Sequence, residues 1–81
     1  MKSENHIIIK EFLINEITTT AKEKNLTDEQ IAELLDISVR AYYYIKSGKN
    51  NCSTVTLLQY LIRVCPDVDN FLNKVKTLIL Q

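Results

Sequence analysis

The sequence predicts an all-α fold in which five helices form a single domain over residues 1–81. Glycine and proline each occur only once, so few positions interrupt regular structure. Apolar residues recur at the spacing that places them on one face of a helix. Four of the expected helices are preceded by a residue suited to capping a helix N-terminus, at Thr27, Ser38, Ser53 and Asp67.

The first helix is expected to begin between Ser3 and His6 and to end near Lys24. Its core face consists of Ile9, Leu13, Ile17 and Ala21. Further apolar side chains widen this face beyond what one small core needs, namely Ile7, Ile8, Phe12 and Ile14. This surplus predicts a surface that another protein chain covers.

Two short helices come next, joined by a tight turn. Thr27 and Gln30 have the spacing of a capping box, so the second helix begins at Asp28. Ser38 is the N-cap candidate of the third helix and follows the second after only two residues. Helices connected by so short a turn are expected to cross steeply.

Three consecutive tyrosines lie in the third helix, within the acid-free segment Ile37–Asn51 (ISVRAYYYIKSGKNN). They cannot all face the same way, because successive residues of a helix are 100° apart. This spacing turns Tyr42 toward the core together with Ile45. It leaves Tyr43 and Tyr44 at the surface.

The fourth helix is expected over about 54–64, between the stop at Gly48 and the stop at Pro66. Apolar residues cover more than half of its circumference, which predicts that it is the central helix: Val55, Leu57, Leu58, Tyr60, Leu61, Ile62 and Val64. Asp67 then caps the last helix. A single apolar stripe follows it to the C-terminus, formed by Val68, Phe71, Leu72, Val75, Leu78 and Ile79.

Charge is distributed unevenly although the formal net charge is zero. Residues 1–36 carry four lysines and eight acids, and residues 37–66 carry two lysines, two arginines and no acid. A net charge of zero alone argues against a nucleic-acid partner. The basic block around the third helix favours one.

The remaining features indicate a protein with reduced cysteines and no enzymatic activity. Its expected location is the cytoplasm. Cys52 and Cys65 are too far apart for a CxxC pair and His6 is the only histidine, so free thiols and no metal site are expected. The apolar run 7–14 is interrupted by charges, which excludes a signal peptide or membrane span there. No catalytic base lies at a suitable spacing, and no cofactor or small-molecule ligand is evident.

From Leu26 to Leu72 the chain resembles the Xre-like, Cro and phage-repressor type of helix-turn-helix domain. The matching positions are Leu26-Thr27, Ile31-Ala32, Ile37-Ser38, Tyr42, Ile45, Gly48-Lys49, Thr56-Leu57-Leu58, Val68-Asp69 and Phe71-Leu72. The resemblance implies a lambda-repressor-like five-helix bundle with its helix-turn-helix at about 27–47. It also implies binding to double-stranded DNA as a homodimer.

The chain departs from the family pattern at several positions. Asp36 stands where glycine is usual in the turn, and Asp tolerates the left-handed conformation better than most residues. Lys46 and Ala21 replace a glutamate and an arginine that commonly pair, so both charges of that pair are absent together. Cys52 replaces a common proline, which is expected only to loosen the loop.

The resemblance implies a set of DNA-contacting residues, with the third helix in the major groove. Base contacts would come from Val39, Arg40, Tyr43 and Tyr44. Phosphate contacts would come from Thr27, Asp28, Ser38, Lys49, Asn50 and Asn51.

Each of these residues also has a simpler interpretation. Arg40 and Lys49 are of types that are often merely solvated on a surface. Exposed tyrosines such as Tyr43 and Tyr44 mark protein interfaces as readily as DNA interfaces. Asp28 would repel phosphate, which favours the interpretation that it stabilises the positive end of its helix.

The leading hypothesis is a small sequence-specific transcriptional regulator, a repressor that binds an inverted-repeat operator as a dimer. The expected dimer interface combines the C-terminal helix with the surplus of the first helix: Val75, Leu78, Ile79, Leu80, Ile8 and Phe12. The alternative is a protein-interaction module, such as an antirepressor or adaptor, built on the same bundle.

Overall fold

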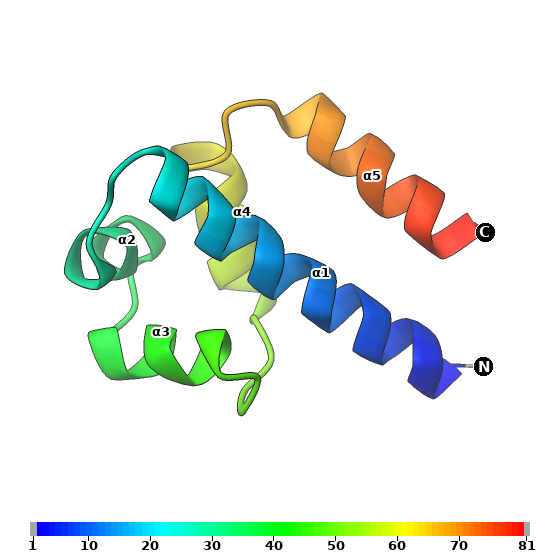
Figure 1. The fold of residues 1–81 in the computed structure, drawn as a ribbon, viewed down its shortest axis with the longest axis horizontal. Helices are drawn as coiled ribbons and strands as arrows, with labels where there is room; N and C mark the ends of the chain where they lie inside the picture. Colours follow the sequence, from blue (N-terminus) through cyan, green and yellow to red (C-terminus); the bar gives the residue numbers. More distant parts are fainter. Residues whose placement is uncertain (1, 81) are drawn as a thin grey trace.

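The computed structural model describes residues 2–80, which form five helices packed around one core (Figure 1). The helices are α1 (Lys2–Glu23), α2 (Asp28–Leu35), α3 (Val39–Lys46), α4 (Thr54–Arg63) and α5 (Val68–Leu80). The described residues contain no strand, so the prediction of an all-α fold is confirmed for them.

The long helix α1 runs across most of the length of the molecule (Figure 1). Helix α2 packs against α3 and α4, and α1 packs against α5 and α3. The short helices α2 and α3 lie at one end of the molecule, and the N-terminal half of α1 and the end of α5 lie at the other (Figure 1). The molecule extends about 35 by 26 by 20 Å.

Side-chain caps set the beginnings of the helices, as the sequence predicted. The Thr27 hydroxyl accepts from the Gln30 amide at 3.1 Å, and the Gln30 side chain accepts from the Thr27 amide at 2.8 Å. The Ser38 hydroxyl accepts from the Ala41 amide at 3.0 Å. Ser53 and Asp67 cap α4 and α5 with equivalent bonds to the amides of Thr56 and Asn70. These bonds satisfy donors that a helix start leaves without partners.

Left-handed backbone conformations end α1, α2 and α3. Asp36 has a φ of 59°, so the prediction for this turn residue is confirmed. Asn25 has a φ of 58° after α1, a second such position that the sequence did not reveal. Gly48 follows α3 with a φ of 81°. Asp and Asn adopt this conformation more readily than other side chains, and glycine adopts it freely.

The core is centred on Tyr60 of α4, whose side chain is fully buried. Its hydroxyl lies 3.0 Å from the hydroxyl of the buried Thr20 on α1, so the polar end of the ring has a partner. Phe71 of α5 packs between this ring and Phe12 of α1, with ring centres 5.9 and 5.6 Å apart. The other buried apolar residues are Ile17, Ala21, Ile31, Ala32, Leu35, Tyr42, Ile45 and Val64.

Helix α4 contributes the centre of the core, but the prediction that its apolar residues are covered around most of its circumference is wrong for one side. Val55, Leu58 and Ile62 are 67%, 51% and 80% exposed, and they lie on the side of α4 opposite its buried face. Leu72 of α5, expected in the core stripe, is also half exposed. A helical wheel identifies apolar faces, but it does not show which of them the chain itself covers.

Candidate nucleic-acid interface

Helix α3 is held by its partners along one side and is open to solvent along the other. Tyr42 and Ile45 are buried against the core, whereas Tyr43 is 61% exposed. The prediction that Tyr42 points inward and Tyr43 outward is therefore confirmed. Burial and, to a smaller extent, the nearby negative charge of Asp28 together raise the pKa of Tyr42 to about 12.

The exposed side of α3 begins at its N-terminus. Val39 is 43% exposed, and Arg40 is also exposed. With Tyr43 they form a surface that combines a guanidinium, a methyl-bearing side chain and a phenol. These three residues are called the α3 face below. Arginine in such a position can donate two parallel hydrogen bonds to one acceptor pair.

Tyr44 was also predicted at the surface, but it is half-buried and so differs from Tyr43. The Lys49 ammonium lies 4.7 Å from the centre of the Tyr44 ring, a cation–π geometry. The Tyr44 carbonyl accepts from the amides of Lys49 and Asn50 at 2.9 and 3.2 Å. Tyr44 therefore fixes the loop after α3, in which Lys49, Asn50 and Asn51 are exposed.

An ion pair joins α2 to α3 beside this face. The Lys46 ammonium lies 3.3 Å from both carboxylate oxygens of Asp28. The same ammonium lies 5.5 Å from the centre of the Tyr42 ring. The sequence did not predict this pair, because Asp28 and Lys46 lie 18 positions apart. Because Lys46 offsets the charge of Asp28, an anion near the start of α2 meets less repulsion than Asp28 alone would produce.

Two of the four predicted capping residues, Thr27 and Ser38, keep hydrogen-bonding capacity after capping. The hydroxyl oxygens of Thr27 and Ser38 each accept one amide hydrogen. Their own hydroxyl hydrogens remain available to donate. Both residues are exposed, at the N-termini of α2 and α3, where backbone dipoles favour a negative charge.

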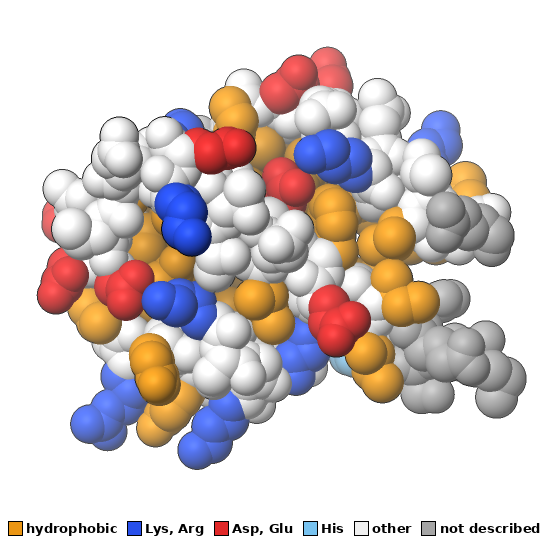
Figure 2. Space-filling model, in the orientation of Figure 1, with side chains coloured by type: hydrophobic (Ala, Val, Ile, Leu, Met, Phe, Trp, Pro, Cys, Tyr) orange, Lys and Arg blue, Asp and Glu red, His pale blue; other side chains and the backbone are white. Residues whose placement is uncertain are grey.

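The charge separation of the sequence persists in three dimensions. Figure 2 shows Lys and Arg side chains projecting from the edge of the molecule at which α3 lies in Figure 1. Acidic side chains gather around α2 and near the start of α5 in the same view (Figure 2). The α3 face and the loop after it therefore form the basic side of a molecule whose net charge is zero.

No protein-family model, curated protein or solved structure matches this chain. Within residues 2–80, no group of three His, Cys, Asp or Glu side chains is arranged to hold a metal ion. None of the helices described has both the length and the apolar character needed to cross a membrane. Cys52 and Cys65 are half-buried free thiols, and burial raises the pKa of Cys52.

If this basic side binds DNA, Asp28→Asn should strengthen that binding. The change releases the Lys46 ammonium, which can then neutralise one phosphate. The plot of the logarithm of the binding constant against the logarithm of the salt concentration should then become steeper by about 0.9. The free energy of unfolding should change by less than about 1 kcal/mol, because the ion pair is partly exposed. Titration of labelled duplex DNA at several salt concentrations measures the slope. An unchanged slope would contradict this role for Lys46.

Proposed function

We propose that this protein is a DNA-binding transcriptional regulator that reads base edges with the α3 face. The observation that carries the proposal is the division of α3 into a buried side, Tyr42 and Ile45, and an exposed, acid-free side. A helix presented in this way fits the major groove of duplex DNA. The resemblance to Cro-type and phage-repressor domains supports the same conclusion.

In this proposal each exposed group has a defined role. Arg40 donates two hydrogen bonds to guanine, and Val39 packs against a thymine methyl group. Tyr43 contacts a base edge or a phosphate through its hydroxyl, and Tyr44 does so from its half-buried position beside the loop. Phosphates on either side are bound by residues of the helix starts and the loop: Thr27, Ser38, Lys49, Asn50 and Asn51. Asp28 acts indirectly, through its ion pair with Lys46.

The direct test is binding to DNA fragments at two salt concentrations. Affinity must fall steeply as salt rises, because phosphate contacts release counterions. A selection from random duplex sequences then identifies the preferred site. Absence of salt-dependent binding to any duplex would overturn the proposal.

Arg40→Ala should relax the preference at one base pair of each half-site. The expected loss is about 1–3 kcal/mol on the preferred site and little on random DNA, because a lost base contact affects only the matching base. Lys49→Ala is the matched control, since a phosphate contact contributes equally on all sequences. Equal effects of the two variants on preferred and random DNA would remove Arg40 from the base-reading residues.

A homodimer completes the proposal, because one short helix reads only one half-site. Apolar side chains remain exposed near the end where both termini lie (Figure 1). Ile8, Ile79 and Leu80 are 43%, 45% and 72% exposed. Leu78 is half-buried. Phe12 and Val75 already pack against the core, so less of their surface is available to a partner. A dimer that reads two half-sites one DNA turn apart needs its two α3 helices roughly 34 Å apart.

Ile79→Asp should convert the dimer into a monomer and remove most operator affinity. A charge in a contact between apolar surfaces is left without a partner, whereas in the monomer this side chain remains solvated. Leu58→Asp on the exposed side of α4 is the matched control and should leave the dimer intact. Sedimentation at micromolar concentration measures both. A monomeric wild-type protein that binds one half-site tightly would contradict this prediction.

A second candidate function is a protein-interaction module. The exposed stripe of Val55, Leu58 and Ile62 on α4 favours it, because contiguous apolar surface usually marks an interface. In that case Leu58→Asp would abolish binding of the partner protein and leave any DNA binding unchanged.

A further inference from the structure

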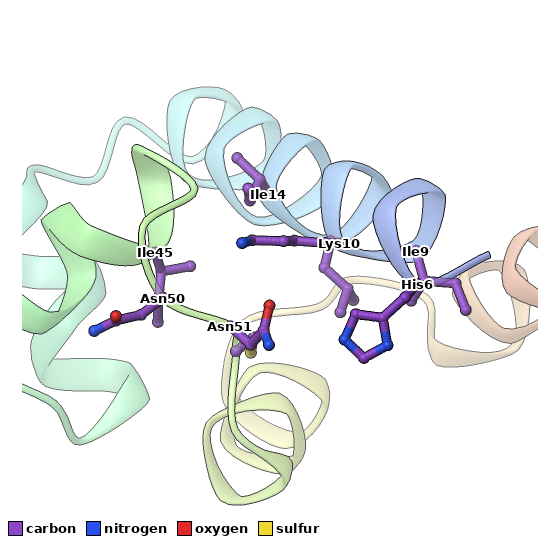
Figure 3. A pocket seen from close by; sticks show the side chains of 9 residues that line it. His6, Ile9, Lys10, Ile14, Ile45, Asn50 and Asn51 are labelled. Atoms are coloured by element: carbon purple, nitrogen blue, oxygen red, sulfur yellow. The ribbon is translucent and has the colours of Figure 1, made fainter. Parts of the chain in front are cut away.

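A cleft of about 380 Å³ opens between the N-terminal half of α1 and the loop that follows α3 (Figure 3). Its walls are mainly apolar and consist of Ile9, Leu13, Ile14, Ile45 and Cys52. Its polar groups come from His6, Lys10, Asn50 and Asn51. The volume is near the lower end of the range of about 300–1,000 Å³ that is usual for small-molecule sites.

Among the residues whose side chains the structure describes, those that line the cleft include a cation and no acid. Lys10 is half-buried, and in Figure 3 its side chain extends from α1 toward α3 and the loop. The ion pairs found among the described residues involve Lys46 and Lys74, so none of them engages Lys10. The side chain of Asn51 adds an amide donor to the same cleft. An ammonium above apolar walls, without a counter-charge, is complementary to a molecule with an anionic head and an apolar tail.

We infer that this cleft binds a free medium-chain alkyl carboxylate. The alkyl chain lies against Ile9, Leu13 and Ile45, and the carboxylate accepts hydrogen bonds from Lys10 and Asn51. A single ammonium matches a monoanion better than it matches a doubly charged phosphate. The half-open, apolar walls favour a flexible chain over a large rigid ring system.

The loop connects this cleft to the proposed DNA interface. Asn50 and Asn51 line the cleft and are also proposed phosphate contacts. A bound carboxylate would occupy the Asn51 amide and add a negative charge beside the DNA backbone. Carboxylate and DNA should therefore weaken each other's binding by the same factor. Only this coupling rests on the proposed function, because carboxylate binding can be measured without DNA.

The test is titration of the isotope-labelled protein with hexanoate, octanoate and decanoate, monitored by amide chemical shifts. Changes should concentrate at residues 50–52 and along one side of α1 near Lys10. Affinity should rise about three- to fourfold per added methylene, as burial of the chain requires. The uncharged 1-octanol should bind at least about tenfold more weakly than octanoate, because it forms no charge-assisted hydrogen bond.

Lys10→Met tests the cation while keeping the apolar stem. It should weaken octanoate at least about tenfold and leave 1-octanol unchanged. Lys22→Met is the matched control on the same helix, away from the cleft, and should change neither. Circular dichroism establishes that both variants are folded.

Three results would overturn the inference: equal affinity for octanoate and 1-octanol, no effect of Lys10→Met, or shift changes centred on the α4 stripe of Val55, Leu58 and Ile62. Octanoate that binds the free protein but leaves DNA affinity unchanged would overturn the coupling alone. A protein that binds octanoate but no DNA would refute the proposed function and keep the assignment of the cleft.

Discussion

Replacing Tyr42 with aspartate should unfold the protein, whereas replacing its neighbour Tyr43 with alanine should leave stability nearly unchanged. Tyr42 is only 2% exposed, so the change removes a large core side chain and buries a carboxylate in its place. Lys46 cannot readily compensate, because its ammonium is already paired with Asp28. The expected loss exceeds about 4 kcal/mol, a large part of the stability of a small protein.

Tyr43→Ala is the matched control because the two residues are adjacent on the same helix. A surface substitution should change the free energy of unfolding by no more than about 0.5 kcal/mol. Thermal denaturation followed by circular dichroism compares the variants, and duplex binding of Tyr43→Ala reports on the α3 face. If both variants melt equally early, the orientation of α3 described above is incorrect.

Raising the pH from 10 to 12 should destabilise the protein by several kcal/mol. Burial raises the pKa of both Tyr42 and Tyr60 from the ordinary value of 10.0 to about 12. A phenol with a raised pKa contributes stability that is fully present below pH 10 and is lost as the pH rises toward 12. The loss is on the order of 2–3 kcal/mol for each tyrosine.

Phenylalanine variants separate this effect from the deprotonation of lysines in the same range. Tyr42→Phe keeps the ring and cannot ionise, so it should lose less stability between pH 10 and pH 12 than the wild type. Denaturant unfolding at fixed pH values measures the free energy, and absorbance near 295 nm follows tyrosinate formation. Equal alkaline losses in wild type, Tyr42→Phe and Tyr60→Phe would assign the effect to other groups.

The positions of the helices along the sequence were predictable because their signals are local. Hydroxyl and carboxylate caps at Thr27, Ser38, Ser53 and Asp67 lie within three residues of the amides that they bind. The helical period alone distinguished Tyr42 from Tyr43. The tolerance of aspartate for positive φ similarly predicted the conformation of Asp36.

Features that depend on contacts between distant segments were not predictable. The ion pair of Asp28 with Lys46 spans 18 positions, and the hydrogen bond of Thr20 with Tyr60 spans 40. The cleft is assembled from α1, α3 and the loop, which no periodicity relates to one another. The exposure of Ile62 was missed for the same reason, since it depends on where α5 and α1 come to lie.

The second apolar side of α4 also affects how copies of the protein behave toward one another in solution. With a formal net charge of zero and an isoelectric point near 6.5, long-range electrostatic repulsion between molecules is weak around neutral pH. The exposed apolar stripe on α4 therefore promotes aggregation whenever nothing covers it. The stripe consists of Val55, Leu58 and Ile62. A partner that binds this stripe would protect the protein from aggregation.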